Sequence, residues 1–216
     1  MDAGTETLSD CSLREFAHAS AARTPTPGGG AISAALGVHG ATMGAMAARF
    51  TEGRKGFEQH APVLAAEVKR LDQLRDQLLE LIDADARAYA GVGAAYGLPR
   101  GTPEEKQARQ AAIQSALVAA MQPPLAICRA AVTGLAVLDS LRQHVNPNVA
   151  SDVAVGAYAL AAAFRGASVN VLINLKGITD ADLRDKVSRE GAELAERAAE
   201  LETGIATAVV TAIEGG

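Results

Sequence analysis

Asp85 is a carboxylate set into an apolar helical stripe. Apolar residues recur at three- and four-residue steps on both sides of it: Leu78, Ile82, Tyr89 and Val92. This spacing places Asp85 on the buried face of a helix and turns Asp83 elsewhere. A buried carboxylate has a raised pKa unless it is paired, which suits general acid or base catalysis near neutral pH. A structural Asp that accepts hydrogen bonds or pairs with an arginine fits the same position equally well.

Two further polar sets could bind a small molecule. The stretch NPNVASD places Asn148, Ser151 and Asp152 in a loop and at a helix start, where Ser and Asp also serve as ordinary caps. Asn170 and Asn174 lie one turn apart on an otherwise apolar helix, and a buried amide needs a partner or a ligand. Asp152 and Asn170 are about 27 Å apart along a helix axis. If both serve one site, another subunit or an antiparallel neighbouring helix must supply one of them.

Gly28, Gly29 and Gly30 open an apolar segment. Consecutive N–H groups at the positive end of a helix can bind an anion or a carbonyl, although a plain helix start explains the glycines as well. No GK[ST] follows and no strand precedes, which excludes a P-loop and a dinucleotide fingerprint. Arg54 and Lys55 lie in the polar loop TEGRKGFEQ, where they suit carboxylates or form a solvated surface.

Helical periodicity runs along the whole chain with almost no strand alternation, so we expect an all-α, single-domain multi-helix bundle over residues 1–216. Thr102, Pro103 and Glu105 form a specific helix start. The other expected boundaries are a helix over 12–19, one from the glycines to about 50, a long one from about 64 to 96, a break at Pro123-Pro124, a helix reaching Leu141, one capped by Ser151 and ending near 177, and a last one capped by Thr179 with Asp182.

Small residues line one face of the segment after the glycines: Gly37, Gly40, Gly44 and Ala48. They permit close helix packing within the subunit or across a dimer. Residues 31–48 and 153–175 are long enough to cross a bilayer. His39 and Arg165 within these segments, the absence of Trp and the lack of basic flanks argue against membrane insertion.

Charge, cysteine content and the N-terminal sequence indicate which binding partners and which cellular location to expect. The net charge is −5, and Lys and Arg are scattered, so no nucleic acid is expected. Cys11 and Cys128 form no CxxC pair and have no His-rich neighbourhood, so we expect two small buried thiols and no metal. The first ten residues lack the basic and apolar regions of a signal peptide, which makes a cytoplasmic location the expectation.

Several motifs occur in a recognisable order: TPTPGGGAISAALGVHGATMGAMAARFT, GRK, DARAY, AYGLPR, EEKQAR, IQSAL, NPNVASD and RGASVNVLINLKG. From about Ser12 to the last helix the chain resembles the formimidoyltetrahydrofolate cyclodeaminase and methenyltetrahydrofolate cyclohydrolase family. The resemblance implies an all-helical homodimer that binds folate near the subunit interface, with the glycine turn lining the folate cleft. Val145 and Gly56-Phe57 depart from the family pattern and leave the substrate open.

The resemblance implies a folate-dependent enzyme with no metal and no cofactor beyond its tetrahydrofolate substrate. The AYGLPR and EEKQAR context and the lack of a fused formiminotransferase domain favour a methenyltetrahydrofolate cyclohydrolase over a cyclodeaminase. A non-catalytic folate-binding helical dimer is a third alternative. The implied roles are acid/base catalysis by Asp85 and Asp152, pterin positioning by Asn148, Ser151, Asn170 and Asn174, a cleft lined by Gly28, Gly29 and Gly30, and tail binding by Arg54 and Lys55.

Overall fold

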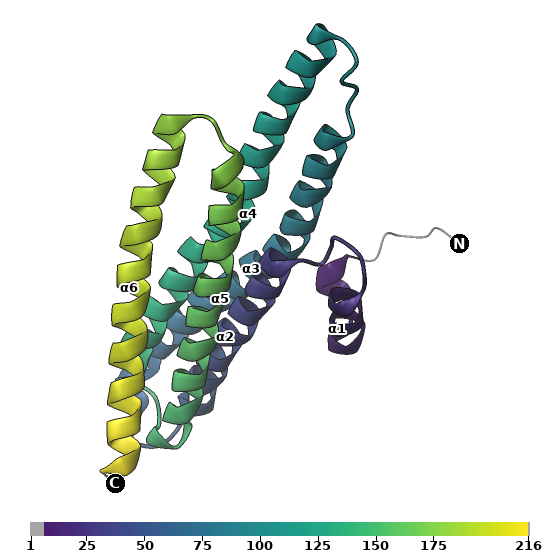
Figure 1. The fold of residues 1–216 in the computed structure, drawn as a ribbon. Helices are drawn as coiled ribbons and strands as arrows, with labels where there is room; N and C mark the ends of the chain where they lie inside the picture. Colours follow the sequence, from purple (N-terminus) through teal and green to yellow (C-terminus); the bar gives the residue numbers. More distant parts are fainter. Residues whose placement is uncertain (1–6, 216) are drawn as a thin grey trace.

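The computed structural model describes residues 7–215, and within them it contains six α-helices and no strand (Figure 1). The all-α prediction is confirmed. The first six residues of the stretch used to exclude a signal peptide lie outside the described part. The helices are α1 (Leu13–Ala21), α2 (Gly29–Thr51), α3 (Ala61–Tyr96), α4 (Pro103–Leu141), α5 (Ala150–Gly177) and α6 (Ala181–Glu214). Short 3-10 turns lie at Leu8–Asp10, Glu58–His60 and Pro147–Val149.

Helix α4 begins as predicted and does not break where predicted. Thr102 accepts from the N–H of Glu105, and the Glu105 side chain accepts in return from the backbone of Thr102. The expected interruption at Pro123-Pro124 is wrong, because both prolines are buried inside a continuous 39-residue helix. A proline removes one helical hydrogen bond, and tertiary packing on the buried prolines outweighs that loss here.

Two other predicted caps are also wrong. The 3-10 turn Pro147–Val149 runs directly into α5, so Ser151 lies inside the helix and Val149 stands at the cap position. Helix α6 is capped by Asp180, whose side chain accepts from the N–H of Leu183. The N–H and hydroxyl of Thr179 both donate to the side-chain oxygen of Gln114 instead, which ties the α5–α6 turn to α4.

The small-residue face of α2 packs inside the subunit. A Cβ on Gly40 would lie 2.6 Å from Leu160 and 2.9 Å from the carbonyl of Gly156, so α2 and α5 meet almost backbone to backbone. A Cβ on Gly44 would lie 2.2 Å from Leu138. Of the two alternatives for this face, the intramolecular one therefore holds.

Burial inside the subunit accounts for part of the apolar character of the helices. By length and composition alone, α2, α4 and Pro147–Gly177 could each cross a membrane. In the bundle, the buried share of the most apolar 18-residue stretch is 56% in α2, 61% in α4 and 44% in Pro147–Gly177. The sequence reasoning considers only two such segments, since it divides α4 at the prolines.

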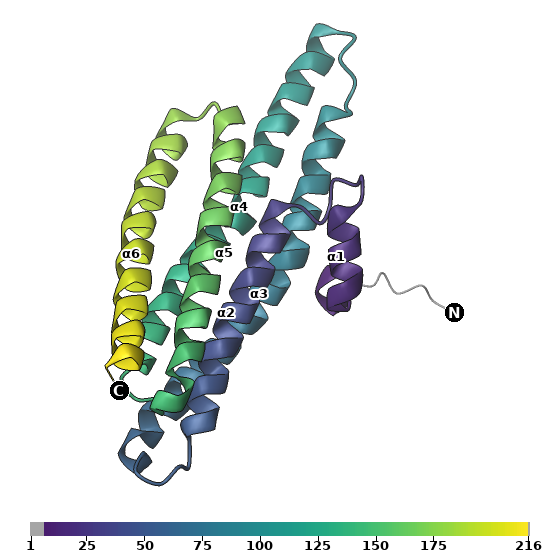
Figure 2. The same ribbon diagram turned by 60° about the horizontal axis from the view of Figure 1, so that its bottom comes forward.

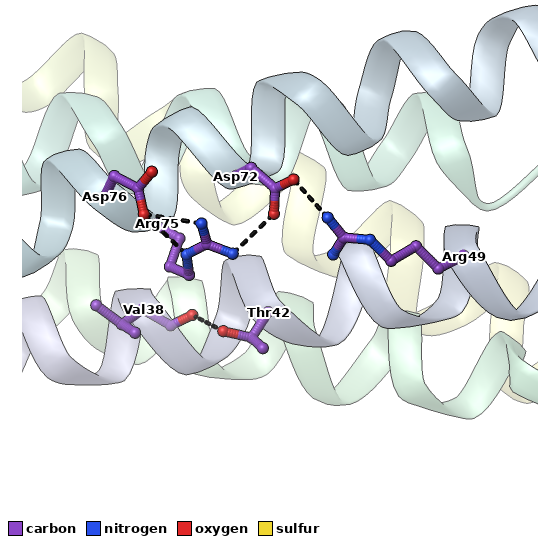
Figure 3. A network of polar contacts seen from close by, with 6 residues as sticks. All are labelled: Val38, Thr42, Arg49, Asp72, Arg75 and Asp76. Atoms are coloured by element: carbon purple, nitrogen blue, oxygen red, sulfur yellow. Dashed lines mark hydrogen bonds and ion pairs between the residues drawn. The ribbon is translucent and has the colours of Figure 1, made fainter.

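One ion pair joins α2 to α3, and an arginine of α3 contacts the same carboxylate (Figure 3). Arg49 of α2 bonds Asp72 of α3, and Arg75 donates to Asp72 at 2.8 Å and to Asp76 at 2.9 Å. The four side chains are between 28% and 63% exposed, so each pair contributes at most about 1 kcal/mol. Apolar packing, rather than this network, therefore holds the two helices together.

Helix α1 stands beside the bundle, and the α3–α4 hairpin projects past its neighbours (Figures 1 and 2). No residue of α1 is buried. The segment before it is fixed by Asp83, which accepts from the N–H of Leu8 at 2.7 Å and from the hydroxyl of Ser9 at 2.6 Å. Asp83 thus points away from the position of Asp85, as the helical spacing predicts.

Candidate functional site

A pocket of about 370 Å³ opens where the glycine turn meets α3, α4 and α5. Sequence-predicted residues on its wall are Gly28, Gly29, Asp85, Asn170 and Asn174. The remaining wall residues are Pro25, Thr26, Tyr89, Leu117, Ala120 and Ile173. The pocket thus combines a few fixed polar groups with apolar walls, which is typical of a small-molecule site.

Asp85 caps α2 from a neighbouring helix. Its Oδ2 accepts from the N–H of Ala31 at 3.1 Å, in the first turn of α2, where Gly28 has no side chain with which to cap. Burial raises the pKa of the Asp85 carboxyl, and the hydrogen bond from Ala31 opposes that rise only in part. The carboxylate is therefore a structural cap whose pKa is raised by its burial.

The glycines are required by the closeness of these side chains. A Cβ on Gly30 would lie 2.0 Å from Oδ1 of Asp85, and one on Gly29 would lie 2.9 Å from Nδ2 of Asn170. Gly30 itself is buried behind the pocket. The turn thus brings the α2 backbone against Asp85 and Asn170 without a side chain between them.

Five other predicted residues lie at the opposite end of the bundle: Arg54, Lys55, Asn148, Ser151 and Asp152. Ser151 and Asp152 lie in the first turn of α5, and Asn148 lies in the 3-10 turn before it. Asn170 lies 18 positions beyond Asp152 on the same helix, so the axial separation of about 27 Å holds in the folded chain. At that end the N–H of Asn146 donates to the buried hydroxyl of Thr51 at 2.9 Å, which joins the end of α2 to the loop before α5. One subunit does not bring the two polar sets together.

Some details of that end differ from the sequence prediction. Thr51 was expected in a polar loop and is the buried last residue of α2. Arg54 lies over the ring of Phe50 at 5.5 Å, and Lys55 is exposed. His60 and His144, whose Nδ1 atoms are 3.0 Å apart, connect the loop that carries Arg54 to the loop before α5. The basic loop is thus fixed at its C-terminal end.

Sequence reasoning missed several pocket residues. Tyr89 was expected to be buried, yet it is 51% exposed and lines the pocket, because α3 extends beyond its neighbours. Pro25, Thr26, Leu117 and Ile173 lie within the quoted motifs but were not singled out as site residues. A signal did exist for Ala120: Pro124 has no N–H to donate to the carbonyl four residues earlier, so a polar partner was needed there.

Cys128 and Cys11 differ in their environments. Cys128 is buried, as predicted, and burial raises the pKa of its thiol to about 12. Cys11 is only partly buried. Across residues 7–215, no three His, Cys, Asp or Glu side chains are grouped so that they could hold a metal ion.

Comparison with known proteins identifies the family. Residues 12–193 match the family described as formiminotransferase-cyclodeaminase. The chain belongs to this family. It is 36% identical over 198 residues to the formimidoyltransferase-cyclodeaminase of Rattus norvegicus, an alignment that covers 91% of this chain and 37% of that protein. The chain thus spans little more than a third of the length of this relative.

Two proteins of similar length also match this family member. It is 36% identical over 178 residues to the methenyltetrahydrofolate cyclohydrolase of Methylorubrum extorquens, covering 82% of this chain and 83% of that one. The crystal structure of formiminotetrahydrofolate cyclodeaminase from Thermotoga maritima superposes with a TM-score of 0.78 at 31% identity, covering 95% and 96% of the two chains. The helical fold is therefore shared along nearly the full length.

Proposed function

We propose that the protein is a methenyltetrahydrofolate cyclohydrolase. The observation that carries this proposal is the carboxylate of Asp85, held in the pocket with a raised pKa beside the glycine turn. The similarity to the cyclohydrolase of Methylorubrum extorquens, which extends over most of both chains, supports it. Asp85 is the acid/base group of this reaction.

In the proposed reaction, water adds to the electrophilic methenyl carbon that joins N5 and N10 of the folate. The Asp85 carboxylate accepts a proton from the attacking water, and the bond from that carbon to N5 breaks as N5 receives a proton. The products are 10-formyltetrahydrofolate and one released proton. A carboxyl whose pKa lies closer to neutrality than usual performs both transfers more readily at physiological pH.

Cyclodeaminase activity is the second candidate, favoured by the likeness to the Thermotoga maritima enzyme over 95% of the chain. In that reaction N10 attacks the formimidoyl carbon and ammonia leaves, which again requires a proton donor and acceptor at the same carbon. Turnover should be measured on 5,10-methenyl- and 5-formimidoyltetrahydrofolate side by side. Faster loss of methenyl absorbance with enzyme supports the cyclohydrolase, and ammonia release supports the cyclodeaminase. Bound methenyl chromophore without accelerated loss indicates a binding protein.

We further propose that the working form is a homodimer whose site combines both ends of the bundle. Asp85 and Asp152 lie at opposite ends, so a partner related by a twofold axis must supply one of them if both act on one substrate. Apolar side chains are exposed along α2 and α5 between the two ends: Ile32, Leu36, Val155, Tyr158, Val169 and Ile173. Such a face suits a subunit interface. Arg54 and Lys55 of the partner would then reach the glutamate tail.

Mixing inactive variants tests the shared site. When Asp85→Asn and Asp152→Asn proteins exchange subunits at random, half of the dimers are mixed and each holds one intact site, so activity should recover to about a quarter of wild type. Each variant alone, taken through the same exchange, is the control. If subunits exchange and no activity returns, the shared site is contradicted. If the fully active protein is a monomer by light scattering, the dimer is contradicted.

A further inference from the structure

The orientation of two amide side chains in the pocket can be deduced from their neighbours. Nδ2 of Asn170 lies 2.9 Å from the carbonyl oxygen of Gly166. Nδ2 of Asn174 lies 2.9 Å from the carbonyl oxygen of Asn170 and 3.4 Å from that of Ala120. A backbone carbonyl only accepts hydrogen bonds, so the amide atom beside it must be the NH₂ group. Each amide therefore donates to the backbone through its NH₂ group, and this contact identifies which of its two polar atoms is the oxygen.

The contact with Ala120 arises from the proline pair of α4. Pro124 has no N–H, so the carbonyl of Ala120 loses the donor that a regular helix would supply. Asn174 supplies a donor from α5 instead. Rotating the Asn174 amide by half a turn would set its oxygen against two carbonyl oxygens and leave Ala120 without a partner, which costs about 1–3 kcal/mol. The proline pair thus leaves a carbonyl that needs a donor, and that carbonyl determines the orientation of the Asn174 amide.

The oxygens of both amides remain available. Within residues 7–215, neither Oδ1 of Asn170 nor Oδ1 of Asn174 receives a hydrogen bond, although both residues line the pocket. On the facing helix α3, Oδ2 of Asp85 already accepts from Ala31. The α5 wall of the pocket therefore offers two acceptor oxygens. Both N–H groups of Asn174 and one of the two on Asn170 already donate to the backbone.

We propose that Oδ1 of Asn170 and Oδ1 of Asn174 recognise the donor edge of the substrate, namely the exocyclic 2-amino group and the adjacent N3–H of the reduced pterin. This assignment rests on the proposed folate site and specifies which edge of the ring faces α5. Each accepted hydrogen bond is lost when the ligand lacks the corresponding N–H, and the oxygen is then left unpaired. The two asparagines are thus specificity-determining residues that reject ring systems lacking these donors.

The test compares two ligands and four proteins. The ligands are 5,10-methenyltetrahydrofolate and its 2-desamino-2-methyl analogue, with dissociation constants from equilibrium titration. Wild type should bind the analogue about 10–100-fold more weakly, as expected when an acceptor loses its donor. One of the variants Asn170→Ala and Asn174→Ala removes the oxygen that accepts from the 2-amino group. In that variant the ratio of the two dissociation constants should fall to about threefold or less, because no acceptor is left unpaired when the analogue binds.

A further variant serves as a control for loss of folding. Asn174→Ala leaves the carbonyl of Ala120 unpaired, so the double variant Pro124→Ala/Asn174→Ala, which restores the helical N–H at position 124, is titrated in parallel. Equal binding of both ligands to wild type would overturn the assignment while leaving the folate function standing. An unchanged ratio in both the Asn170→Ala protein and the double variant would also overturn it. No binding of either ligand to folded wild type would overturn the folate function, and the assignment with it.

Discussion

Gly30→Ala tests the placement of the Asp85 carboxylate by adding a single methyl group. Gly30 is helical and buried, so alanine fits the backbone and the new Cβ is the whole perturbation. That Cβ would lie 2.0 Å from Oδ1, 2.4 Å from Cγ and 2.6 Å from Oδ2 of Asp85. Ordinary contact requires about 3.5 Å, so the carboxylate must move by about 1.5 Å.

The displacement should reduce activity much more than stability. A misplacement of about 1 Å in a catalytic group can cost about 10²-fold, so we expect kcat to fall by about that factor. The hydrogen bond from Ala31 to Asp85 is lost, at about 1.5–2 kcal/mol for a partly buried charged acceptor. The greater helix propensity of alanine offsets about 0.5–1 kcal/mol. A net loss of about 1 kcal/mol lowers Tm by about 2–4 °C in a chain of this size.

Gly91→Ala is the matched control, because Gly91 is helical and a Cβ there meets nothing within 4 Å. It should raise Tm slightly through helix propensity and leave kcat unchanged. Tm and kcat are measured on the same preparations of wild type and both variants. If Gly30→Ala and Gly91→Ala show the same kcat, Asp85 is either not displaced or not catalytic, and the reasoning fails.

Four further predictions concern the site and the core. Asp85→Asn keeps an oxygen that can accept from Ala31, so it should fold and yet lower kcat by about 10²–10⁴, and near-wild-type kcat would refute catalysis by Asp85. Because burial raises the pKa of Asp85, the folded chain holds that proton to higher pH than the unfolded chain. Wild type should therefore lose stability relative to Asp85→Asn as the pH rises from the ordinary carboxyl pKa through the raised pKa. A difference in unfolding free energy between the two proteins that does not change with pH contradicts this prediction. Charge reversal at Arg54 and Lys55 should raise KM more than it lowers kcat, and an unchanged KM on mono- and polyglutamylated substrate counts against tail binding. The Cys128 thiol, with a pKa of about 12, should resist iodoacetamide at pH 8 until the protein unfolds; equal labelling rates in folded and denatured protein would show that it is not buried.

Local patterns in the sequence identified most of the helices and half of the candidate site. The spacing around Asp85 indicated its face correctly because one helix fixes its own side-chain directions. The capping pattern at Thr102 was likewise correct, since both partners lie within four residues. Ser151 and Thr179 failed as caps because their surroundings are set by the preceding 3-10 turn and by Gln114, a residue 65 positions away from Thr179.

The sequence by itself determined that the chain is helical, which face of α3 carries Asp85, and how far apart Asp152 and Asn170 must lie, since these follow from periodicity and from the rise per residue. Only the tertiary structure decided that the proline pair stays within one helix and that Asp85 caps α2. It also decided that Asn174 donates to the carbonyl left free in α4. Each of these features depends on a contact between separate helices. A proline within a helix or a helix start without its own cap leaves backbone groups without hydrogen bonds, and such an element is stable only when a distant side chain supplies the missing partner or core packing offsets the loss.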